Sequence, residues 1–164
     1  MRVLAIRRDP GVGSEGVAVH PPGALHDLLP QTDALLLTLP LTAETRGLIG
    51  APELKLLPQG AILVNVGRGP LVDQEALYHA LESGKLHGAG LDVWYNYPHD
   101  EESRCDTPPA DFPFDQLDNV VMSPHRAGST QETERLRLIH LAESLNAAAR
   151  GEPIPNPVDL EAGY

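Results

Sequence analysis

The 164-residue sequence has little of several residue types, and each scarcity excludes a class of protein. Its one cysteine, Cys105, cannot form an internal disulfide and lies in a polar, proline-rich stretch without a nucleophile motif, which is consistent with a reducing, cytoplasmic compartment. Only 12 lysines and arginines stand against 23 aspartates and glutamates, giving a formal net charge of −11. Nucleic acid and anionic membranes are therefore poor partners, whereas small anions remain accessible to local arginines.

Aromatic residues make up only 4% of the chain, so its core must be aliphatic. No apolar run is long enough to span a bilayer, and the first residues lack the apolar region of a signal peptide. No cluster of residues suggests a metal site. These absences predict a cytoplasmic globular protein without membrane or metal partners.

Short apolar runs alternate with helical patterns, which predicts an α/β fold with a parallel sheet and crossover helices. The expected strands cover residues 2–6, 17–19, 34–39, 61–65, 88–93 and 120–123, and the expected helices cover 24–29, 52–57 and 74–83. A charged, proline-rich stretch at 98–113 is expected to be a long loop.

A further helix is expected after Ser129, because Ser129–Glu132 has the pattern of a capping box. Leu138, Leu141, Leu145 and Ala148 fall on one side of this helix, and Gly151 ends it.

The most informative stretch is Val64–Asp73, in which glycines flank Arg68 at the end of an apolar strand. We expect Gly67 and Gly69 to adopt unusual dihedral angles and to let a ligand approach closely. Asp73 is a candidate N-cap for the next helix. A guanidinium on such a turn suits a carboxylate or phosphate.

Together with Leu39–Gly47, Gly88–Val93 and Ser123–Thr130, this stretch resembles the D-isomer-specific 2-hydroxyacid dehydrogenases. The resemblance runs from about residue 1 to residue 157. It implies an incomplete Rossmann-like, doubly wound parallel sheet with a long C-terminal helix. Residues 1–128 would form a partial dinucleotide-binding domain, and residues 129–164 the helix and tail that in the family return to the substrate domain.

The same resemblance implies what is missing. Family members begin with a substrate domain and a strand with a G-x-G-x-x-G turn, and no such turn occurs here. Gly11–Gly16 has its glycines one position too close together and opens no helix. Without that strand the sheet would lose a central member and expose its edges, so we expect little cofactor binding by this chain alone.

The resemblance implies two catalytic residues. Arg68 would hold the carboxylate of a 2-keto acid and polarise its carbonyl, and His125 would protonate the oxygen as hydride arrives. The alternatives are a surface arginine paired with an acid and a structural histidine.

Here the sequence departs from the family pattern, because Tyr97 stands where a glutamate usually precedes the proline. That glutamate would bind the imidazole and favour its protonated form. Tyr97 could orient the ring instead, or an acid at Asp100, Glu101 or Glu102 could substitute.

The implied cofactor is NAD(P). Asp92 resembles the aspartate near the nicotinamide, and the alternative is a helix or turn cap. Arg7 and Arg8 stand where NAD-specific relatives have an acid for the ribose, which favours NADP, unless both are simply exposed loop residues. The remaining expected cofactor contacts are Pro40 and Thr45 on the adenosine and pyrophosphate side, and Val66, Gly67, Arg68, His125 and Gly128 along the cleft.

Two hypotheses about function follow. The first is an oxidoreductase, or a part of one, that transfers hydride between NAD(P) and a small 2-hydroxy or 2-keto acid. The second is a non-catalytic, dinucleotide-responsive interaction module or an inactive remnant. Either could require a second copy of the chain or the missing N-terminal half as a partner.

Overall fold

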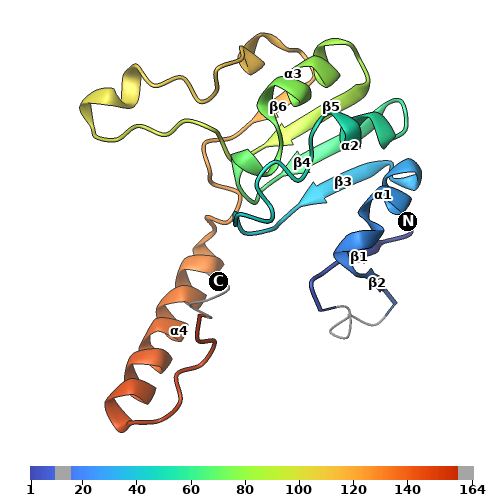
Figure 1. The fold of residues 1–164 in the computed structure, drawn as a ribbon. Coiled ribbons are helices and arrows are strands. Elements are labelled where there is room, and N and C mark those ends of the chain that lie inside the picture. Colours follow the sequence, from blue (N-terminus) through green and yellow to red (C-terminus); the bar gives the residue numbers. More distant parts are fainter. Residues whose placement is uncertain (10–15, 159–164) are drawn as a thin grey trace.

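The computed structural model, which describes residues 1–9 and 16–158, contains two parallel β-sheets (Figure 1). Every strand pairing in both sheets is parallel, which confirms the predicted class. The first sheet pairs β1 (Leu4–Ile6) with β2 (Ala18–His20). The second has the order β3 (Ala34–Leu37), β4 (Ala61–Asn65), β5 (Leu86–Leu91) and β6 (Val120–Met122).

The helices begin and end close to their predicted positions. They are α1 (Leu25–Leu28), α2 (Ala51–Leu56), α3 (Gln74–Glu82) and α4 (Gln131–Arg150), with single 3-10 turns at Pro22–Ala24, Leu29–Gln31, Gly69–Leu71, Glu102–Cys105 and Phe114–Gln116. The predicted cap of α3 is confirmed, since the Asp73 carboxylate accepts a hydrogen bond of 2.8 Å from the Ala76 N–H. The predicted cap of α4 is wrong by one residue. Thr130, not Ser129, has the extended backbone of an N-cap and accepts the Thr133 N–H.

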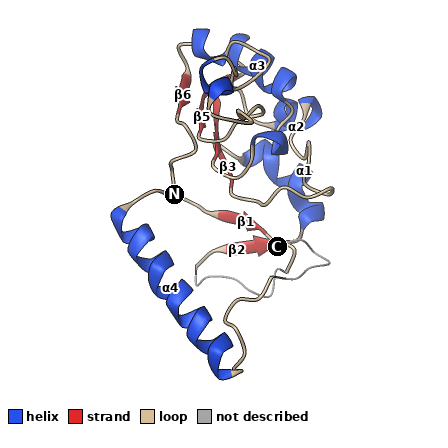
Figure 2. Ribbon diagram, turned by 90° about the vertical axis from the view of Figure 1, so that its left-hand side faces the viewer, coloured by secondary structure: helices blue, strands red, loops and turns tan. Residues whose placement is uncertain are grey.

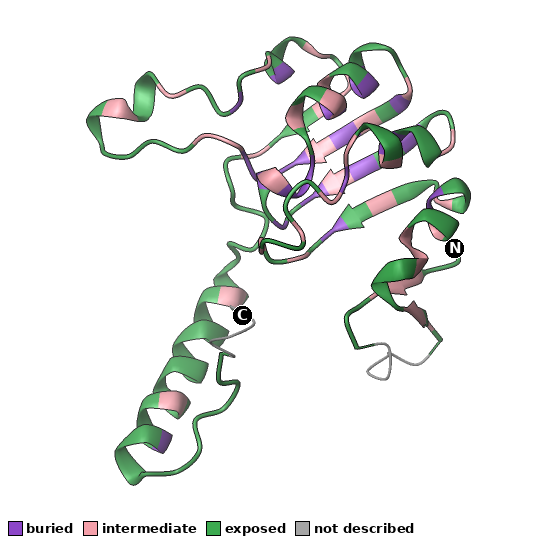
Figure 3. Ribbon diagram, viewed as in Figure 1, coloured by how far each residue is buried: buried purple, intermediate pink, exposed green. Residues whose placement is uncertain are grey.

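The aliphatic core lies between the larger sheet and helices α2 and α3 (Figure 3). Alternate strand residues point into it, and leucines of the two helices complete it. Its most deeply buried members include Leu57, Leu63, Leu71, Leu77, Leu81, Leu86 and Phe114.

The opposite face of the same sheet is apolar and open. Figure 2 shows α2 and α3 together on one side of the strands. On the other side Leu36, Val64, Gly90 and Val121 lie side by side in register across the four strands. Leu36 is 62% exposed and Val121 is 73% exposed. A doubly wound sheet covers both faces, so this chain builds one of the two helical layers.

The sheet is also divided, as expected for a chain without the G-x-G-x-x-G strand. Among the described strands, β1 pairs only with β2, and β3 pairs only with β4, so each has one unpaired edge. The segment Gly11–Gly16, which we compared with that motif, lies outside the described residues except for Gly16.

Helix α4 extends away from the sheet (Figure 1). The side chains of its predicted apolar stripe are solvent-exposed, with Leu138 67% and Leu145 62% exposed. None of the helices in the described ranges is both long and apolar enough to cross a membrane.

Candidate active site at the carboxyl ends of the strands

The segments singled out from the sequence meet at one edge of the larger sheet. Asn65, Leu91 and Met122 end three neighbouring parallel strands and lie in register with one another. The segments that follow them carry Arg68, Asp92 to Tyr97, and His125. In open α/β sheets this carboxyl edge is where ligands bind.

The turn that carries Arg68 is built by Asn65. The buried Asn65 carboxamide donates to the Arg68 carbonyl (2.9 Å) and accepts the Gly67 N–H (3.1 Å). Arg68 is exposed, and its guanidinium donates to the Gly67 carbonyl at 2.6 Å. The described ion pairs of the chain do not include Arg68, so the alternative of a surface pair with an acid gains no support from the structure.

The two glycines of this turn are required by space, not by backbone conformation. Neither has a positive φ, so the expectation of unusual dihedral angles is wrong. A Cβ on Gly67 would lie 2.7 Å from the Leu39 carbonyl oxygen, and a Cβ on Gly69 would lie 2.2 Å from the Trp94 carbonyl oxygen. The turn is therefore closely packed between two segments, the one that follows β3 and the one that follows β5.

Asp92 holds the loop that carries His125. Its buried carboxylate accepts hydrogen bonds from Ser123 Oγ, from the Arg126 N–H (2.7 Å) and from the Ala127 N–H (2.9 Å). This is the turn-cap alternative considered for Asp92. The loop needs such support because His125 has φ = 57°, a left-handed conformation that is costly for a residue with a side chain.

Burial by itself would raise the pKa of Asp92. The hydrogen bonds from Ser123, Ala127 and Arg126 and the nearby His125 outweigh burial and lower the pKa below its ordinary value of 3.8. A carboxylate with a lowered pKa stabilises the fold above its unfolded-state pKa. That contribution is lost as the pH falls through the folded-state value.

We expect Asp92→Asn to lower the stability of the chain by about 2–3 kcal/mol at neutral pH, because an amide cannot accept all three hydrogen bonds. Thermal unfolding followed by circular dichroism should show a midpoint lower by roughly 5–10 °C. The difference in midpoint between wild type and variant should begin to narrow as the pH falls below about 3.9, the unfolded-state pKa of an aspartate, and should close as the pH falls through the lower folded-state pKa. An equal difference in unfolding midpoint at acidic and at neutral pH would contradict the role given to the Asp92 carboxylate.

Tyr97 is the side chain that the structure places against His125. Its hydroxyl lies 3.3 Å from His125 Nδ1 and accepts the Trp94 N–H at 3.1 Å. Of the three acids proposed as substitutes, Glu102 makes no hydrogen bond or ion pair with His125 among the described residues, and the other two are engaged elsewhere. The Asp100 carboxylate accepts the Ser103 N–H at 2.8 Å, and Glu101 pairs with Arg104 at 3.7 Å.

The residues expected at the adenosine end also approach one another. Arg8, after β1, forms an ion pair of 3.1 Å with Glu44, which lies in the turn after β3. Within that turn Thr45 Oγ1 donates to the Pro40 carbonyl at 2.8 Å, so the hydroxyl of Thr45 has a structural role. Arg7 is exposed beside Arg8, and its N–H donates to the His20 carbonyl at 3.0 Å.

Two residues expected to contact the cofactor through their backbone, Val66 and Gly128, are accessible, and the Val66 N–H donates to the Leu37 carbonyl at 3.1 Å. Val66 is 39% exposed at the end of β4. Gly128 is exposed, and a Cβ placed there would meet no atom within 4 Å. The fold itself therefore does not require glycine at position 128.

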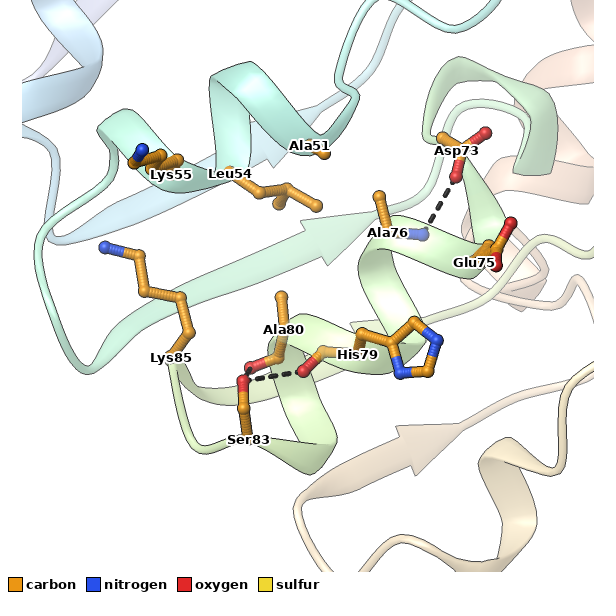
Figure 4. Close-up of a pocket in the computed structure, with 10 residues that line it drawn as sticks. All are labelled: Ala51, Leu54, Lys55, Asp73, Glu75, Ala76, His79, Ala80, Ser83 and Lys85. Carbon is orange, nitrogen blue, oxygen red and sulfur yellow. Dashed lines mark hydrogen bonds between the residues drawn. The ribbon is translucent and has the colours of Figure 1, made fainter.

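The larger of the two described cavities, about 540 Å³, lies between α2 and α3 (Figure 4). Neither Arg68 nor His125 lines it, and Figure 4 shows Lys55 and Lys85 at one end and Asp73 and Glu75 at the other. A second cavity of about 370 Å³ lies beside the candidate site. Its lining residues are Trp94, Asn96, Tyr97, Pro98, Thr107, Pro109, Met122, Ser123 and Pro124. Within residues 1–9 and 16–158, no group of three or more His, Cys, Asp or Glu side chains could hold a metal ion.

Sequence reasoning missed the residues that support the site. Asn65 shapes the Arg68 turn, and Trp94 ties the β5 segment to the His125 loop by donating from Nε1 to the Ser123 carbonyl at 2.9 Å. The only available signal for Asn65 was a polar residue at the end of an otherwise apolar strand. Trp94, as the one tryptophan of the chain, could have been singled out by its rarity.

Comparison with known proteins gives a consistent result. The sequence model of the family described as "D-isomer specific 2-hydroxyacid dehydrogenase, NAD binding domain" matches residues 1–127. The chain is 42% identical to a glyoxylate reductase of Korarchaeum cryptofilum over 164 positions, which cover 98% of this chain and 46% of the relative. It is 37% identical to a D-3-phosphoglycerate dehydrogenase of Methanocaldococcus jannaschii, covering 90% of this chain and 26% of that protein.

Solved structures agree. A D-isomer specific 2-hydroxyacid dehydrogenase from Xanthobacter autotrophicus, in complex with NADPH and MES, superposes with a TM-score of 0.83 at 36% identity, over 99% of this chain and 62% of that one. An NADPH-dependent glyoxylate/hydroxypyruvate reductase from Sinorhizobium meliloti, in complex with NADP and sulfate, superposes with a TM-score of 0.84 at 29% identity. The superposition covers 99% of this chain and 49% of that one. The chain thus spans less than half the length of the curated relatives it matches.

Proposed function

Because the chain belongs to the D-isomer-specific 2-hydroxyacid dehydrogenase family, we propose that it forms part of an oxidoreductase that transfers hydride between NAD(P) and a small 2-keto or 2-hydroxy acid. The observation that carries this proposal is the placement of Arg68, Asp92 and His125 after three neighbouring parallel strands. Glyoxylate and hydroxypyruvate, named for the relatives, are the first substrates to test.

The described residues fit part of a dinucleotide. Arginines at the end of β1 suit a phosphate on the ribose, and Arg8 is linked by its ion pair with Glu44 to the Pro40–Thr45 turn. The exposed carboxyl edge near Asp92 and His125 suits the nicotinamide end. The 164 residues include no G-x-G-x-x-G turn for the pyrophosphate. We therefore expect weak binding by this chain and assign residues 1–128 as a partial dinucleotide-binding domain, with residues 129–164 reaching toward a substrate domain.

Each site residue has a distinct role in the proposed reaction. When bound, reduced NAD(P) supplies the hydride. Arg68 would hold the substrate carboxylate and polarise the adjacent carbonyl. His125 would donate a proton from Nε2 to the carbonyl oxygen as that oxygen gains charge. Asp92 would keep the loop of His125 in its strained conformation, and Tyr97 would orient the imidazole.

We expect NADPH to bind more tightly than NADH, because Arg7 and Arg8 can pair with a 2′-phosphate. Isothermal titration of the chain with each cofactor tests this directly. Replacing both arginines with alanine should weaken NADPH binding about tenfold or more and leave NADH binding nearly unchanged, since a hydrogen bond to a charged group contributes about 1.5–3 kcal/mol. Arg104→Ala, in the exposed loop after β5, is a matched control.

Glyoxylate reduction by NADPH completes the test. Binding of NADPH together with turnover would support the oxidoreductase. Failure to bind either cofactor at millimolar concentration, with a folded chain, would contradict cofactor binding by this half of the protein.

One observation favours the alternative of an interaction module. The open face of the larger sheet presents Leu36, Ile62 and Val121, which are 62%, 41% and 73% exposed. Apolar patches of this kind mark surfaces that pack against another protein segment. A second copy of the chain or an N-terminal half with the missing helical layer would fit this face. Dinucleotide binding without turnover is the result that would favour this alternative.

A further inference from the structure

The hydroxyl of Tyr97 is held between two nitrogen atoms. It accepts the Trp94 N–H at 3.1 Å and lies 3.3 Å from His125 Nδ1. The backbone of Trp94 is well anchored, because its indole is buried and donates to the Ser123 carbonyl at 2.9 Å. The geometry around His125 is therefore set by a fixed donor, a phenol and an imidazole in series.

The chemistry of these groups favours one direction for the hydrogen bond between Tyr97 and His125. A phenol oxygen has one proton to donate and two lone pairs to accept with, and a backbone N–H can only donate. The Trp94 N–H thus occupies one lone pair of Tyr97. Its donation also polarises the phenol and strengthens the hydroxyl as a donor toward the next acceptor in the chain.

Within residues 1–9 and 16–158, no other hydrogen bond to the His125 imidazole competes with the one from Tyr97. Besides Tyr97, the titratable group that the structure places near His125 is Asp92, which interacts with it electrostatically. The hydrogen bonds of the Asp92 carboxylate run to Ser123 Oγ and to the backbone N–H groups of Arg126 and Ala127, not to the imidazole. Nδ1 of neutral His125 can therefore accept the proton of Tyr97.

We propose that Tyr97 is a positioning residue that fixes neutral His125 as the tautomer with its proton on Nε2. Nε2 then carries a hydrogen in both the neutral and the cationic imidazole. Nε2 can therefore donate a hydrogen bond from either form. This inference rests on the proposed role of His125, in which proton transfer to the carbonyl oxygen requires the cationic imidazole. It adds that the neutral imidazole offers a hydrogen-bond donor for the carbonyl of a keto acid and no free ring nitrogen to take a proton from a hydroxy acid.

Nitrogen NMR of the imidazole groups tests the tautomer without cofactor or substrate. The chain is labelled with ¹⁵N-histidine and measured above about pH 8, where histidines are mostly neutral. The resonances of His125 are identified by their loss in His125→Asn. In the wild type, Nε2 of His125 should be protonated and Nδ1 should have the shift of a bare, hydrogen-bonded acceptor.

Two substitutions at position 97 move the tautomer in predicted directions. Tyr97→Phe removes the donor and should change the tautomer ratio by about fivefold toward Nδ1–H. Tyr97→Glu supplies a carboxylate that only accepts, so Nδ1–H should become the main form. Tyr97 is 45% exposed, so either side chain fits without a buried cavity or clash. Tyr78→Phe, on α3, is the matched control and should leave the His125 resonances unchanged.

A wild-type tautomer with its proton on Nδ1, or a ratio that Tyr97→Phe does not alter, would overturn the inference. Neither result depends on hydride transfer. The tautomer assignment can therefore fail while NADPH binds, and it can hold while the proposed function fails.

Discussion

Replacing His125 with asparagine is expected to lower the rate of keto acid reduction by about 10²- to 10⁴-fold, the usual contribution of a positioned general acid. Asparagine is the informative choice because His125 has φ = 57°. Asparagine tolerates this left-handed conformation better than alanine does, so the loop should keep its shape while the proton donor is lost. The measurement is steady-state consumption of NADPH with glyoxylate as substrate.

A matched control separates this effect from general damage. His140 lies on the exposed surface of α4, and His140→Asn should leave the rate and the melting temperature unchanged. His125→Asn should also have a melting temperature close to that of the wild type, because the backbone N–H groups that hold this loop to Asp92 belong to Arg126 and Ala127. A rate within threefold of the wild type would remove His125 from the mechanism.

The positions of the strands could be predicted from the sequence because each strand of the larger sheet is a short apolar run between turn residues. Residues 61–65 were predicted without error, and the other strands differ from the prediction by at most two residues at either end. The cap of α4 was harder to predict. Ser129 and Thr130 are adjacent residues that both cap helices well, and only the backbone conformation at Thr130 decides between them.

The candidate site was predictable only in part. Strand order brings Arg68 and His125 to the same edge, and parallel strands make that outcome a consequence of topology. The contacts that shape the site run between segments far apart in the sequence. Asp92 binds the backbone at residues 126 and 127, and Gly69 packs against Trp94. A pattern of residue types cannot reveal such pairs. The sequence offered a cap role for Asp92 as an alternative, but the partners of Asp92 and of both glycines emerge only from the folded structure.

Gly69 is the position at which one added methyl group should do the most damage to the fold. A Cβ there would lie 2.2 Å from the carbonyl oxygen and 2.5 Å from the carbonyl carbon of Trp94. Both are backbone atoms of a segment anchored by a buried indole, so they cannot move aside as a flexible side chain would. We expect Gly69→Ala to cost at least about 3 kcal/mol, at the upper end of overpacking effects.

The consequence should extend from the fold to the site. Relief of the clash requires the Arg68 turn to separate from Trp94, whose N–H positions Tyr97 against His125. Thermal unfolding should show a midpoint lower by about 10 °C or more, and the His125 imidazole resonances should shift. Gly23→Ala is the matched control, because a Cβ at Gly23 meets no atom within 4 Å and its φ is not positive. If Gly69→Ala and Gly23→Ala had the same midpoint of thermal unfolding, the Arg68 turn and Trp94 could not be packed as closely as described. The proposed link between the Arg68 turn and His125 would then be lost.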